Sequence, residues 1–411
     1  MTKPLRILHT SDWHLGRALY GRRRYAEFGA FLSWLVEVID REGVDVLVVA
    51  GDIFDTLNPS PRAQTLYYQF LGRVATATNC GQVVVVAGNH DSPALLSAPG
   101  EILKALDIHV VGAIGDNPAD EVILLKQDGR DRLIVAAVPY PRDRDLREST
   151  AGESAEDKEI KLARAIRNHY AEVGRLAGEL RDSLPKPVPV VGLGHLFAAG
   201  GQTVDGDGVR GLYVGALGQV PADVFPSAFD YLALGHLHQP QVVGGDETRR
   251  YSGAPLAMTF NEAGRPKSVV LVELEPGRSR VETLEVPVFQ RLEQVQGDWE
   301  ELAAGLKKLI EEEAAAWLEV EYTGQEVLGD LRERLEELTA GTGLEILRIR
   351  NSRLRARALE SREVDESLEE LDEDEVFRRC LAIHEVPEEQ ARELTGAYGE
   401  ILKSLREGGG A

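Results

Sequence analysis

The stretch Val44-Asp-Val-Leu-Val-Val-Ala-Gly-Asp-Ile-Phe-Asp55 joins an apolar, β-branched run to a Gly-Asp pair where the run ends. An apolar run of this length, bounded by glycine and polar residues, predicts a buried strand of a parallel or mixed sheet. Four more runs share the pattern: Leu5–Leu8, Val83–Val86, Val188–Val191 and Tyr231–Leu234. Together they predict an α/β fold whose strands end in polar loops.

The polar fragments at these strand ends carry residue types that bind metal ions. They are Asp12-Trp-His14, Gly51-Asp-Ile-Phe-Asp55, Gly88-Asn-His-Asp91, Gly194-His195 and Gly235-His-Leu-His238. Residues just past the carboxyl ends of strands line the ligand crevice of an open α/β sheet, so we expect the fragments to converge. The converging set has the composition of a two-metal hydrolase site: Asp12, His14, Asp52, Asn89, His195, His236 and His238.

The position of each side chain suggests its part in such a site. Asp52 is the expected bridge between two metals, because it sits directly at a strand end and a carboxylate has two oxygens to share. Asp12 and His14 are two residues apart on a segment that we expect to be extended, so both side chains point the same way. If Asn89 is a ligand, its neighbour His90 points elsewhere and is free to act as a proton donor.

Each fragment alone also fits ordinary turn chemistry or a single well-bonded core histidine. Coincidence, however, would have to place five of the nine histidines just after predicted strands of one domain. The joint pattern therefore predicts a metal site. Neither cysteine, Cys80 or Cys380, lies in any of the five fragments, so the sequence suggests no cysteine nucleophile.

The order of the five fragments resembles that of the calcineurin-like metallophosphoesterases. Longer strings resemble the SbcD components of bacterial SbcCD nucleases, the bacterial branch of the double-strand-break-repair nuclease family, and this resemblance runs over essentially the whole chain. The strings are His9-Thr-Ser-Asp-Trp-His-Leu-Gly16, Ala50-Gly-Asp-Ile-Phe-Asp-Thr56, Ala87-Gly-Asn-His-Asp-Ser92, Ala233-Leu-Gly-His-Leu-His238, Tyr251-Ser-Gly-Ala-Pro255 and Phe260-Asn-Glu-Ala-Gly264.

The resemblance implies two divalent metal ions, with manganese preferred. The first ion would be held by Asp12, His14, Asp52 and His238, and the second by Asp52, Asn89, His195 and His236. Oxygen and imidazole ligands without thiolate fit manganese or iron better than a closed structural zinc site. Two such ions lie about 3.5–4 Å apart, clamp the scissile phosphate and lower the pKa of a bound water.

The resemblance also assigns two catalytic residues. His90 is implied to stabilise the transition state or to protonate the leaving oxygen, and Asp91 to orient the imidazole of His90. Asp55 departs from archaeal and eukaryotic relatives, which carry a histidine there. We therefore expect a structural or supporting role for Asp55 and leave it out of the catalytic set.

The implied function is that of a metal-dependent nuclease subunit, a double-strand exonuclease and a single-strand or hairpin endonuclease in DNA repair and recombination. Its implied partners are an SbcC-type coiled-coil ATPase, double- and single-stranded DNA, and a second copy of the chain in a heterotetramer. The sequence has no Gly-x-x-x-x-Gly-Lys-Ser/Thr phosphate loop, so ATP chemistry falls to the partner. Two rivals are a small-molecule or phosphoprotein phosphatase on the same scaffold and a non-catalytic scaffold for DNA and partner.

Composition sets limits on where and how the chain works. No apolar run approaches the ~20 residues of a membrane span, the N-terminus has no signal-peptide pattern, and the two cysteines make no disulfide framework, so we expect a cytoplasmic protein. The resemblance implies in addition that it is nucleoid-associated. The net charge of −22 is unusual for DNA binding, but residues 288–411 carry 16 Lys and Arg against 31 Asp and Glu. Charge therefore does not exclude DNA, and it suggests that a partner supplies much of the binding surface.

We expect three regions. Residues 1–287 form a two-sheet sandwich flanked by helices, residues 288–356 a small α/β capping domain, which the resemblance links to DNA selection, and residues 357–411 an acidic linker and a helix pair. The predicted helices of the first region are Tyr25–Arg41, Pro61–Thr76, Ala94–Leu106 and Glu156–Leu184, the last with an apolar stripe of Ile160, Ala163, Ile166 and Tyr170. Further strands are predicted at Arg132–Val138, Arg249–Ser252, Val269–Leu274 and Val281–Val286.

The capping domain is predicted from two helical stripes and two strands, Trp317–Tyr322 and Leu344–Ile349. The stripes are Trp299, Leu302, Leu306 and Leu309, then Val327, Leu328, Leu331, Leu335 and Leu338.

Three segments leave alternatives open. The helix pair, near Asp372–His384 and Pro387–Arg406, fits a hairpin packed on its own chain equally well, and the resemblance favours docking on the ATPase. The basic cluster of Arg17 and Arg22–Arg24 fits a solvated loop or contacts to backbone phosphates. The glycine-rich segment Ala198–Gly211 fits a cover over the site, a DNA contact or a plain connector.

Overall fold

The computed structural model describes residues 4–146, 154–198, 220–275, 277–326 and 328–351. The predicted C-terminal linker and helix pair, and nearly all of the segment Ala198–Gly211, lie outside these ranges. The described residues divide into two compact units, one within residues 4–294, 314–319 and 343–347, the other within residues 295–313, 320–342 and 348–351. None of the helices in the described ranges combines the length and apolar character that crossing a membrane would need.

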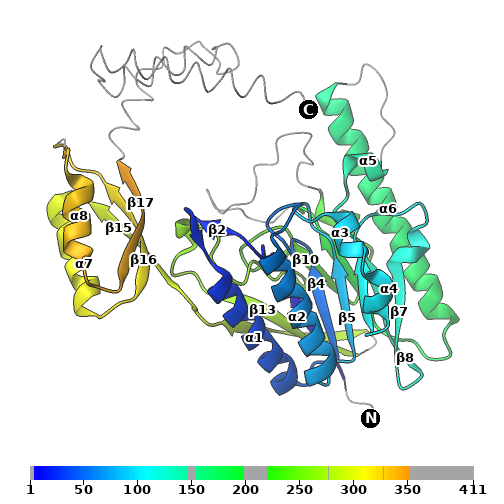
Figure 1. The fold of residues 1–411 in the computed structure, drawn as a ribbon. Coiled ribbons are helices and arrows are strands. Elements are labelled where there is room, and N and C mark those ends of the chain that lie inside the picture. The colour runs from blue at the N-terminus through cyan, green and yellow to red at the C-terminus, as the bar shows by residue number, and fades with distance from the viewer. Residues whose placement is uncertain (1–3, 147–153, 199–219, 276, 327, 352–411) are drawn as a thin grey trace, which may run out of the picture. The chain divides into compact units, whose positions relative to one another are not determined.

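The first unit contains two mixed six-stranded sheets (Figure 1). The first sheet has the order β14 (Arg278–Val286), β13 (Lys267–Glu275), β1 (Leu5–Thr10), β4 (Val46–Ala50), β5 (Gln82–Val86) and β6 (Ile108–Val111). The second has the order β11 (Gln241–Val243), β12 (Asp246–Tyr251), β10 (Tyr231–Gly235), β9 (Val190–His195), β8 (Arg130–Ala137) and β7 (Val122–Gln127). The central strands are parallel, from β1 to β6 in the first sheet and from β8 to β12 in the second.

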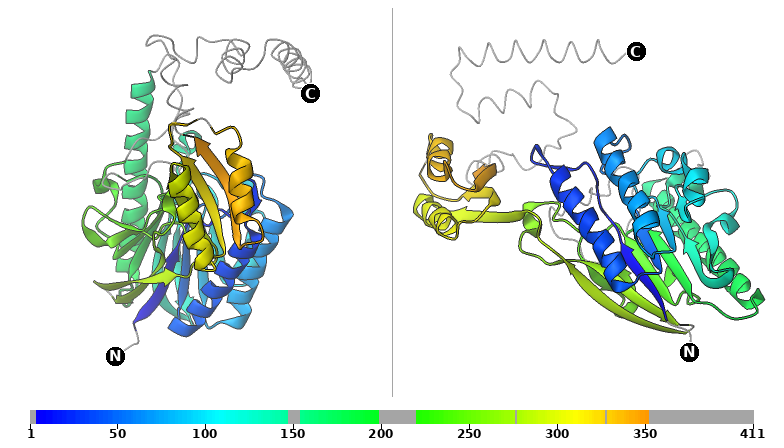
Figure 2. Two further views of the ribbon diagram at one scale, coloured as in Figure 1. Left: turned by 90° about the vertical axis from the view of Figure 1, so that its left-hand side faces the viewer. Right: turned by 60° about the horizontal axis from the view of Figure 1, so that its bottom comes forward.

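The two sheets pack face to face through alternating side chains. Ile7, Val48 and Val84 of the first sheet share one core with Val135 and Val191 of the second. The opposite faces are covered by helices: α1 (Tyr25–Glu42) and α2 (Pro61–Ala77) pack on the first sheet, and α6 (Ala155–Ser183) on the second (Figures 1 and 2). Because both faces of each central strand are buried, those strands read as continuous apolar runs. The predicted two-sheet α/β fold is confirmed.

Local signals place the helix ends. α1 ends at Gly43, which adopts the left-handed conformation that commonly closes a helix. α2 begins after Ser60, whose hydroxyl accepts from the N–H of Ala63, and Pro61 takes the first helical position.

The single helix predicted at Ala94–Leu106 is wrong, because the chain forms two short helices, α3 (Pro93–Ser97) and α4 (Gly100–Lys104). Pro99 separates them, since it has no N–H to continue the first helix. The stripe predicted on α6 is also wrong at its start. Ile160 is 61% exposed, whereas Leu162 and Ile166 are buried. Strands β6 and β7, which the sequence patterns did not predict, complete the edges of the two sheets.

After residue 287 the chain forms a three-stranded sheet in the order β15 (Arg291–Gly297), β16 (Ala316–Tyr322) and β17 (Leu344–Asn351), with helices α7 (Trp299–Glu311) and α8 (Leu331–Thr339). Asp298 and Glu301 form a reciprocal cap at the start of α7. Leu328 lies before α8 and not on its stripe, and Val327 lies outside the described residues. The boundary drawn at residue 288 stays a prediction.

We predict that the buried ion pair of Lys267 with Glu262, the last residue of the short helix η3 (Phe260–Glu262), stabilises the first unit. Both side chains are buried, and the ammonium of Lys267 also donates to the carbonyl oxygen of His238 at 3.3 Å. Lys267→Met leaves the Glu262 carboxylate buried without this counter-charge, so we expect a loss of about 3–5 kcal/mol in urea unfolding.

The matched control is Lys104→Met, which removes the exposed partner of Glu101 and should cost no more than about 1 kcal/mol. The double variant Lys267→Met/Glu262→Leu removes both charges and should recover most of the loss. A Lys267→Met protein as stable as the Lys104→Met control would show that the pair does not stabilise the fold.

Candidate metal centre

The five polar fragments meet at the edge where the parallel strands of both sheets end. Asp12 follows β1, Asp52 follows β4, His90 follows β5, His195 is the last residue of β9, and His238 follows β10. Their ligand atoms form overlapping groups in which all atoms lie within 4.8 Å of one another, and every member is buried. The structure therefore brings together side chains separated by more than 220 residues of sequence.

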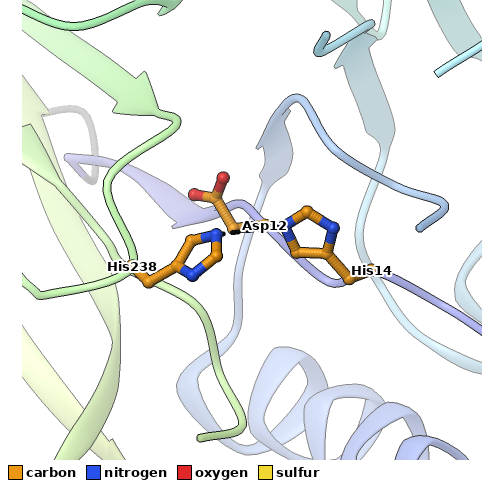
Figure 3. A group of neighbouring side chains, drawn as sticks. All are labelled: Asp12, His14 and His238. Atoms are coloured by element: carbon orange, nitrogen blue, oxygen red, sulfur yellow. Dashed lines mark hydrogen bonds between the residues drawn. The ribbon is translucent and has the colours of Figure 1, made fainter. Parts of the chain in front are cut away.

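One group consists of Asp12, His14 and His238, which converge from the loops after β1 and β10 (Figure 3). The Nε2 atoms of the two histidines lie 3.1 Å apart. The backbone N–H of His236 donates to the Asp12 carboxylate at 2.9 Å, which fixes the carboxylate against the second sheet. These contacts define the first half of the centre.

The second half is built around Asn89. Its Oδ1 atom lies 3.1 Å from Nε2 of His195 and 3.1 Å from Nδ1 of His236. Asp52 joins the two halves, because its Oδ2 atom lies 3.6 Å from Nε2 of His14 and 3.4 Å from Nε2 of His195. The other oxygen, Oδ1, accepts the backbone N–H of His90 at 2.9 Å, so a single oxygen of Asp52 faces both halves.

The loop backbone differs from the predicted extended segment. Asp12 and His14 have positive φ angles of 54° and 47°, and Asp52 and His236 have φ of 51° and 105°. Such conformations are uncommon for these residue types and cluster at functional sites. Here the N–H of Asp12 donates to the Gly51 carbonyl and that of His14 to the Asp52 carbonyl, both at 3.0 Å. The turns are therefore held by the neighbouring loop, and both side chains still reach the centre.

Burial and neighbouring charges together shift the pKa values of the centre. Burial raises the pKa of Asp12 to about 7, and the nearby charge of Asp52 adds to the effect. For Asp52 burial also acts upward, but His195 and then His14 outweigh it and hold the pKa well below its ordinary value. Burial lowers the pKa of His236 to about 3 and lowers that of His14, so both imidazoles are neutral at pH 7. Neutral imidazole is the form that binds metal. For His195 burial acts downward, but the charge of Asp52 outweighs it and raises the pKa to about 9, so a bound metal has to displace a proton from this ring.

The donor set fits divalent cations. Within the described part of the chain, Nε2 of His236 is buried without a hydrogen-bond partner. The facing Nε2 atoms of His14 and His238 carry lone pairs that repel unless a proton or a cation lies between them. Carboxylate, amide and imidazole donors without thiolate fit the harder divalent transition metals.

His90 lies beside this cluster, with its ring 4.8 Å from the ring of His14. Its Nδ1 atom lies 2.8 Å from the carbonyl oxygen of Asp55, which can only accept, so Nδ1 carries the proton and Nε2 is directed elsewhere. Asp55 also has a carboxylate oxygen 3.6 Å from Nδ1 of His14 and 3.2 Å from the guanidinium of Arg17. Asp55 thus contacts the Nδ1 atoms of both histidines and leaves their Nε2 atoms free of it.

The expected contact of Asp91 with the imidazole of His90 is wrong. The two carboxylate oxygens of Asp91 accept the backbone N–H groups of Ile53, Phe54 and Gly88, at 2.8–3.1 Å. The His90 ring is oriented by Asp55 instead. Asp91 is fully buried, and its carboxylate ties the loop after β5 to the loop after β4. The side chain is short, so it reaches these backbone groups more readily than the ring of the adjacent His90.

The basic cluster divides into residues with different surroundings. Arg24 is buried, pairs with Glu27 and donates to the Ala257 carbonyl, so it is neither a solvated residue nor a phosphate contact. Arg17 pairs with Asp55. Arg22 and Arg23 are exposed in strand β3 (Arg22–Arg23), where both predicted alternatives stay open.

Two residues near the centre were missed. The Tyr140 ring lies 6.2 Å from that of His195 and 6.5 Å from that of His236, and Arg142 donates to the Asp91 carbonyl at 2.8 Å. Both follow β8, the neighbour of β9, in the segment Tyr140-Pro-Arg142. The sequence offered one signal for them, because this segment also follows a predicted strand. It was passed over because it contains no Asp, His or Asn.

Comparisons with known proteins agree with this arrangement. Residues 5–240 match the family model described as calcineurin-like phosphoesterase, and residues 288–385 match the Type 5 capsule protein repressor C-terminal domain. The SbcD component of the SbcCD nuclease of Escherichia coli is 38% identical over 408 residues, 98% of each chain. The corresponding protein from Rhodobacter capsulatus is 39% identical over 279 residues, 66% of this chain and 67% of the relative.

Among solved structures, a dimetal phosphatase from Danio rerio is similar with a TM-score of 0.42 and 12% identity, over 70% of this chain and 98% of that chain.

We predict that divalent cations stabilise the chain by binding at this centre. Manganese at about 100 times its Kd should raise the free energy of unfolding by about 2.7 kcal/mol, measured as a rise in Tm after chelator treatment. Asp52→Asn removes the charge shared by both halves and should shrink this rise. Asp116→Asn, an exposed carboxylate away from the centre, is the matched control and should behave as wild type. An undiminished rise in Asp52→Asn would place the bound ions elsewhere.

Proposed function

The chain belongs to the SbcD family of calcineurin-like phosphoesterases, and on this premise we propose that it is the metal-dependent nuclease subunit of an SbcCD-type complex. The observation that carries the proposal is the buried cluster in which Asp52 links two sets of ligands at the strand ends. The reaction proposed is hydrolysis of DNA phosphodiesters. The match to a nuclease subunit over 98% of both chains favours this substrate over a phosphatase substrate.

We propose that two ions bind, and that both are manganese. Asp12, His14, Asp52 and His238 would hold one ion, and Asp52, Asn89, His195 and His236 the other. The contacts that support this division are the 3.1 Å approach of His14 to His238 and the equal 3.1 Å distances from Asn89 to His195 and His236. Bound divalent cations supply Lewis acidity and make hydroxide available near neutral pH.

We propose His90 as the catalytic residue beside the metals. Its Nδ1–H is held by the Asp55 carbonyl, so the free edge of the ring, Nε2, is the one available to a substrate oxygen. Asp91 has a positioning role: it fixes the turn that carries Asn89 and His90 by accepting three backbone N–H groups. This role differs from the one that the family resemblance implies.

The rest of the proposal follows the family. An SbcC-type coiled-coil ATPase would bind residues 357–411, residues 288–356 would form the capping domain that selects DNA, and two copies of the chain would act in one heterotetramer. The proposed activities are exonuclease action on double-stranded ends and endonuclease action on single strands or hairpins. The proposed location is the cytoplasm, at the nucleoid. The full-length similarity to the SbcD protein of Escherichia coli supports these assignments as a set.

We predict that the full chain degrades a labelled blunt-ended duplex in manganese and that His90→Ala lowers kcat by about 10²–10⁴-fold, the usual contribution of a proton-transferring side chain. His109→Ala is the matched control, because His109 is a half-buried histidine in β6 outside the cluster. It should keep wild-type activity.

A generic phosphatase substrate is assayed in parallel. Release of phosphate from it, with the duplex intact even after an SbcC-type ATPase is added, would replace the nuclease proposal by the phosphatase alternative. Wild-type rates in His90→Ala would remove His90 from the catalytic set.

A further inference from the structure

A hollow of about 760 Å³ opens beside the metal centre, and none of the proposed ligands lines it. It is bounded by the loops that follow β4, β5 and β8, and the first two of these also carry Asp52, Asn89 and His90. The chain connectivity keeps the two sites close. The Asp55 carbonyl that holds His90 is two residues before Leu57, which lines the hollow. The hollow therefore adjoins the side of the centre where His90 lies.

The lining of the hollow is positively charged in a chain whose net charge is −22. It contains two guanidinium groups, Arg142 and Arg144, against one carboxylate, Asp143. Arg142 is anchored, because its Nη2 donates to the carbonyls of Asp91 and Gly88 at 2.8 and 3.4 Å. Its Nη1 is buried and has no hydrogen-bond partner among the described residues.

Arg144 differs from Arg142 in being held loosely. Its side chain is 74% exposed, and it donates to the carboxylate of Asp145 at 3.4 Å. A solvated guanidinium at the edge of a hollow is free to contact a backbone phosphate, since little protein structure has to be broken first.

The hollow is also lined by apolar residues. Leu57 is 55% exposed, one of few large apolar side chains in the described ranges that are so open, and Pro93 and Ala94 line the same space. A lining that combines apolar and basic residues suits a nucleotide, whose phosphate is charged and whose base presents an apolar face. Tyr140 lies near both the hollow and the second half of the centre, because its ring is 5.9 Å from the guanidinium of Arg142 and 6.5 Å from the ring of His236.

We propose that this hollow is a subsite for the nucleotide next to the scissile phosphate, and that the nucleotide belongs to a single strand. Arg144 contacts its phosphate, Arg142 adds a fixed positive charge beside it, and Leu57 contacts the face of its base. A single strand is required because an apolar side chain reaches the face of a base only when that base is unstacked. The inference rests on the nuclease function proposed above, and it adds residues that determine how the strand is placed.

The test uses the full chain and two pairs of matched variants. Arg144→Ala is paired with Arg41→Ala, an exposed arginine at the end of α1, and Leu57→Ser with Ile102→Ser, an exposed apolar residue of α4. Binding of a labelled single-stranded oligonucleotide is followed by fluorescence anisotropy in chelator, over a series of salt concentrations. Cleavage in manganese is measured as the ratio of kcat/KM for the oligonucleotide to that for bis(p-nitrophenyl) phosphate, which has no flanking nucleotide.

For Arg144→Ala we expect the slope of log Kd against log salt to fall by about 0.7, the value for one lost phosphate contact on a single strand. For Leu57→Ser we expect roughly fivefold weaker binding with the slope unchanged, because an apolar contact releases no counterions. Both variants should lower the kcat/KM ratio, and Arg41→Ala and Ile102→Ser should match wild type in every measurement.

The outcomes separate the subsite from the function on which it rests. If wild type cleaves neither substrate, the proposed nuclease function fails. If wild type cleaves both and the hollow variants behave like their controls, the function stands and the subsite is wrong. An equal loss on both substrates would also overturn the subsite, since it would place Arg144 or Leu57 in the metal centre rather than at a flanking nucleotide.

Discussion

The centre depends on the close approach of two sheets at the ends of their strands. A Cβ atom at Gly235, at the end of β10, would lie 1.9 Å from the carbonyl oxygen of Ala50 at the end of β4. One at Gly88 would lie 2.1 Å from Oδ1 of Asp52. Any side chain at these positions would push the loops apart, because such distances are far below van der Waals contact. Only with glycine at both can Asp52 reach His14 of one loop and His195 of the opposite sheet.

The same close packing makes the centre energetically costly, because it buries ionisable groups next to one another. Two carboxylates and four imidazoles are buried together, and burial raises the pKa of Asp12 while it lowers those of His14 and His236. Buried charge is retained only when it is paired or bound to a cation. The apolar core between the sheets supplies the stability that holds these groups in place, and bound cations offset the charge that remains. Stability and function therefore come from different parts of the same sandwich.

Residues that support the centre come from places that carry no metal-binding motif. Lys267 of β13 donates to the carbonyl of His238, and Arg142 donates to the carbonyl of Asp91. A lysine and an arginine side chain therefore fix two of the loops that carry the proposed ligands. A search of the sequence for metal ligands selects Asp, His and Asn, so it passes over a lysine and an arginine. Asp91 is the opposite case, a residue inside a motif whose contacts differ from those expected. Its partners are backbone groups and not the neighbouring histidine.

The sequence by itself determined the central strands of both sheets, most helices of residues 1–287 and the nine residues that gather at or beside the centre, because hydrophobic period and glycine-bounded strand ends are local signals. It missed the break at Pro99, the strands β6, β7, β11 and β15 and the left-handed turns at Asp12 and His14. Only the tertiary structure decided that one oxygen of Asp52 faces both halves, that Asp55 orients His90 and that Tyr140 and Arg142 flank the centre. These contacts join loops that are far apart in the sequence, and those of Asp52 with His195 and of Arg142 with Asp91 cross between the two sheets, so their geometry exists only once the sheets have packed.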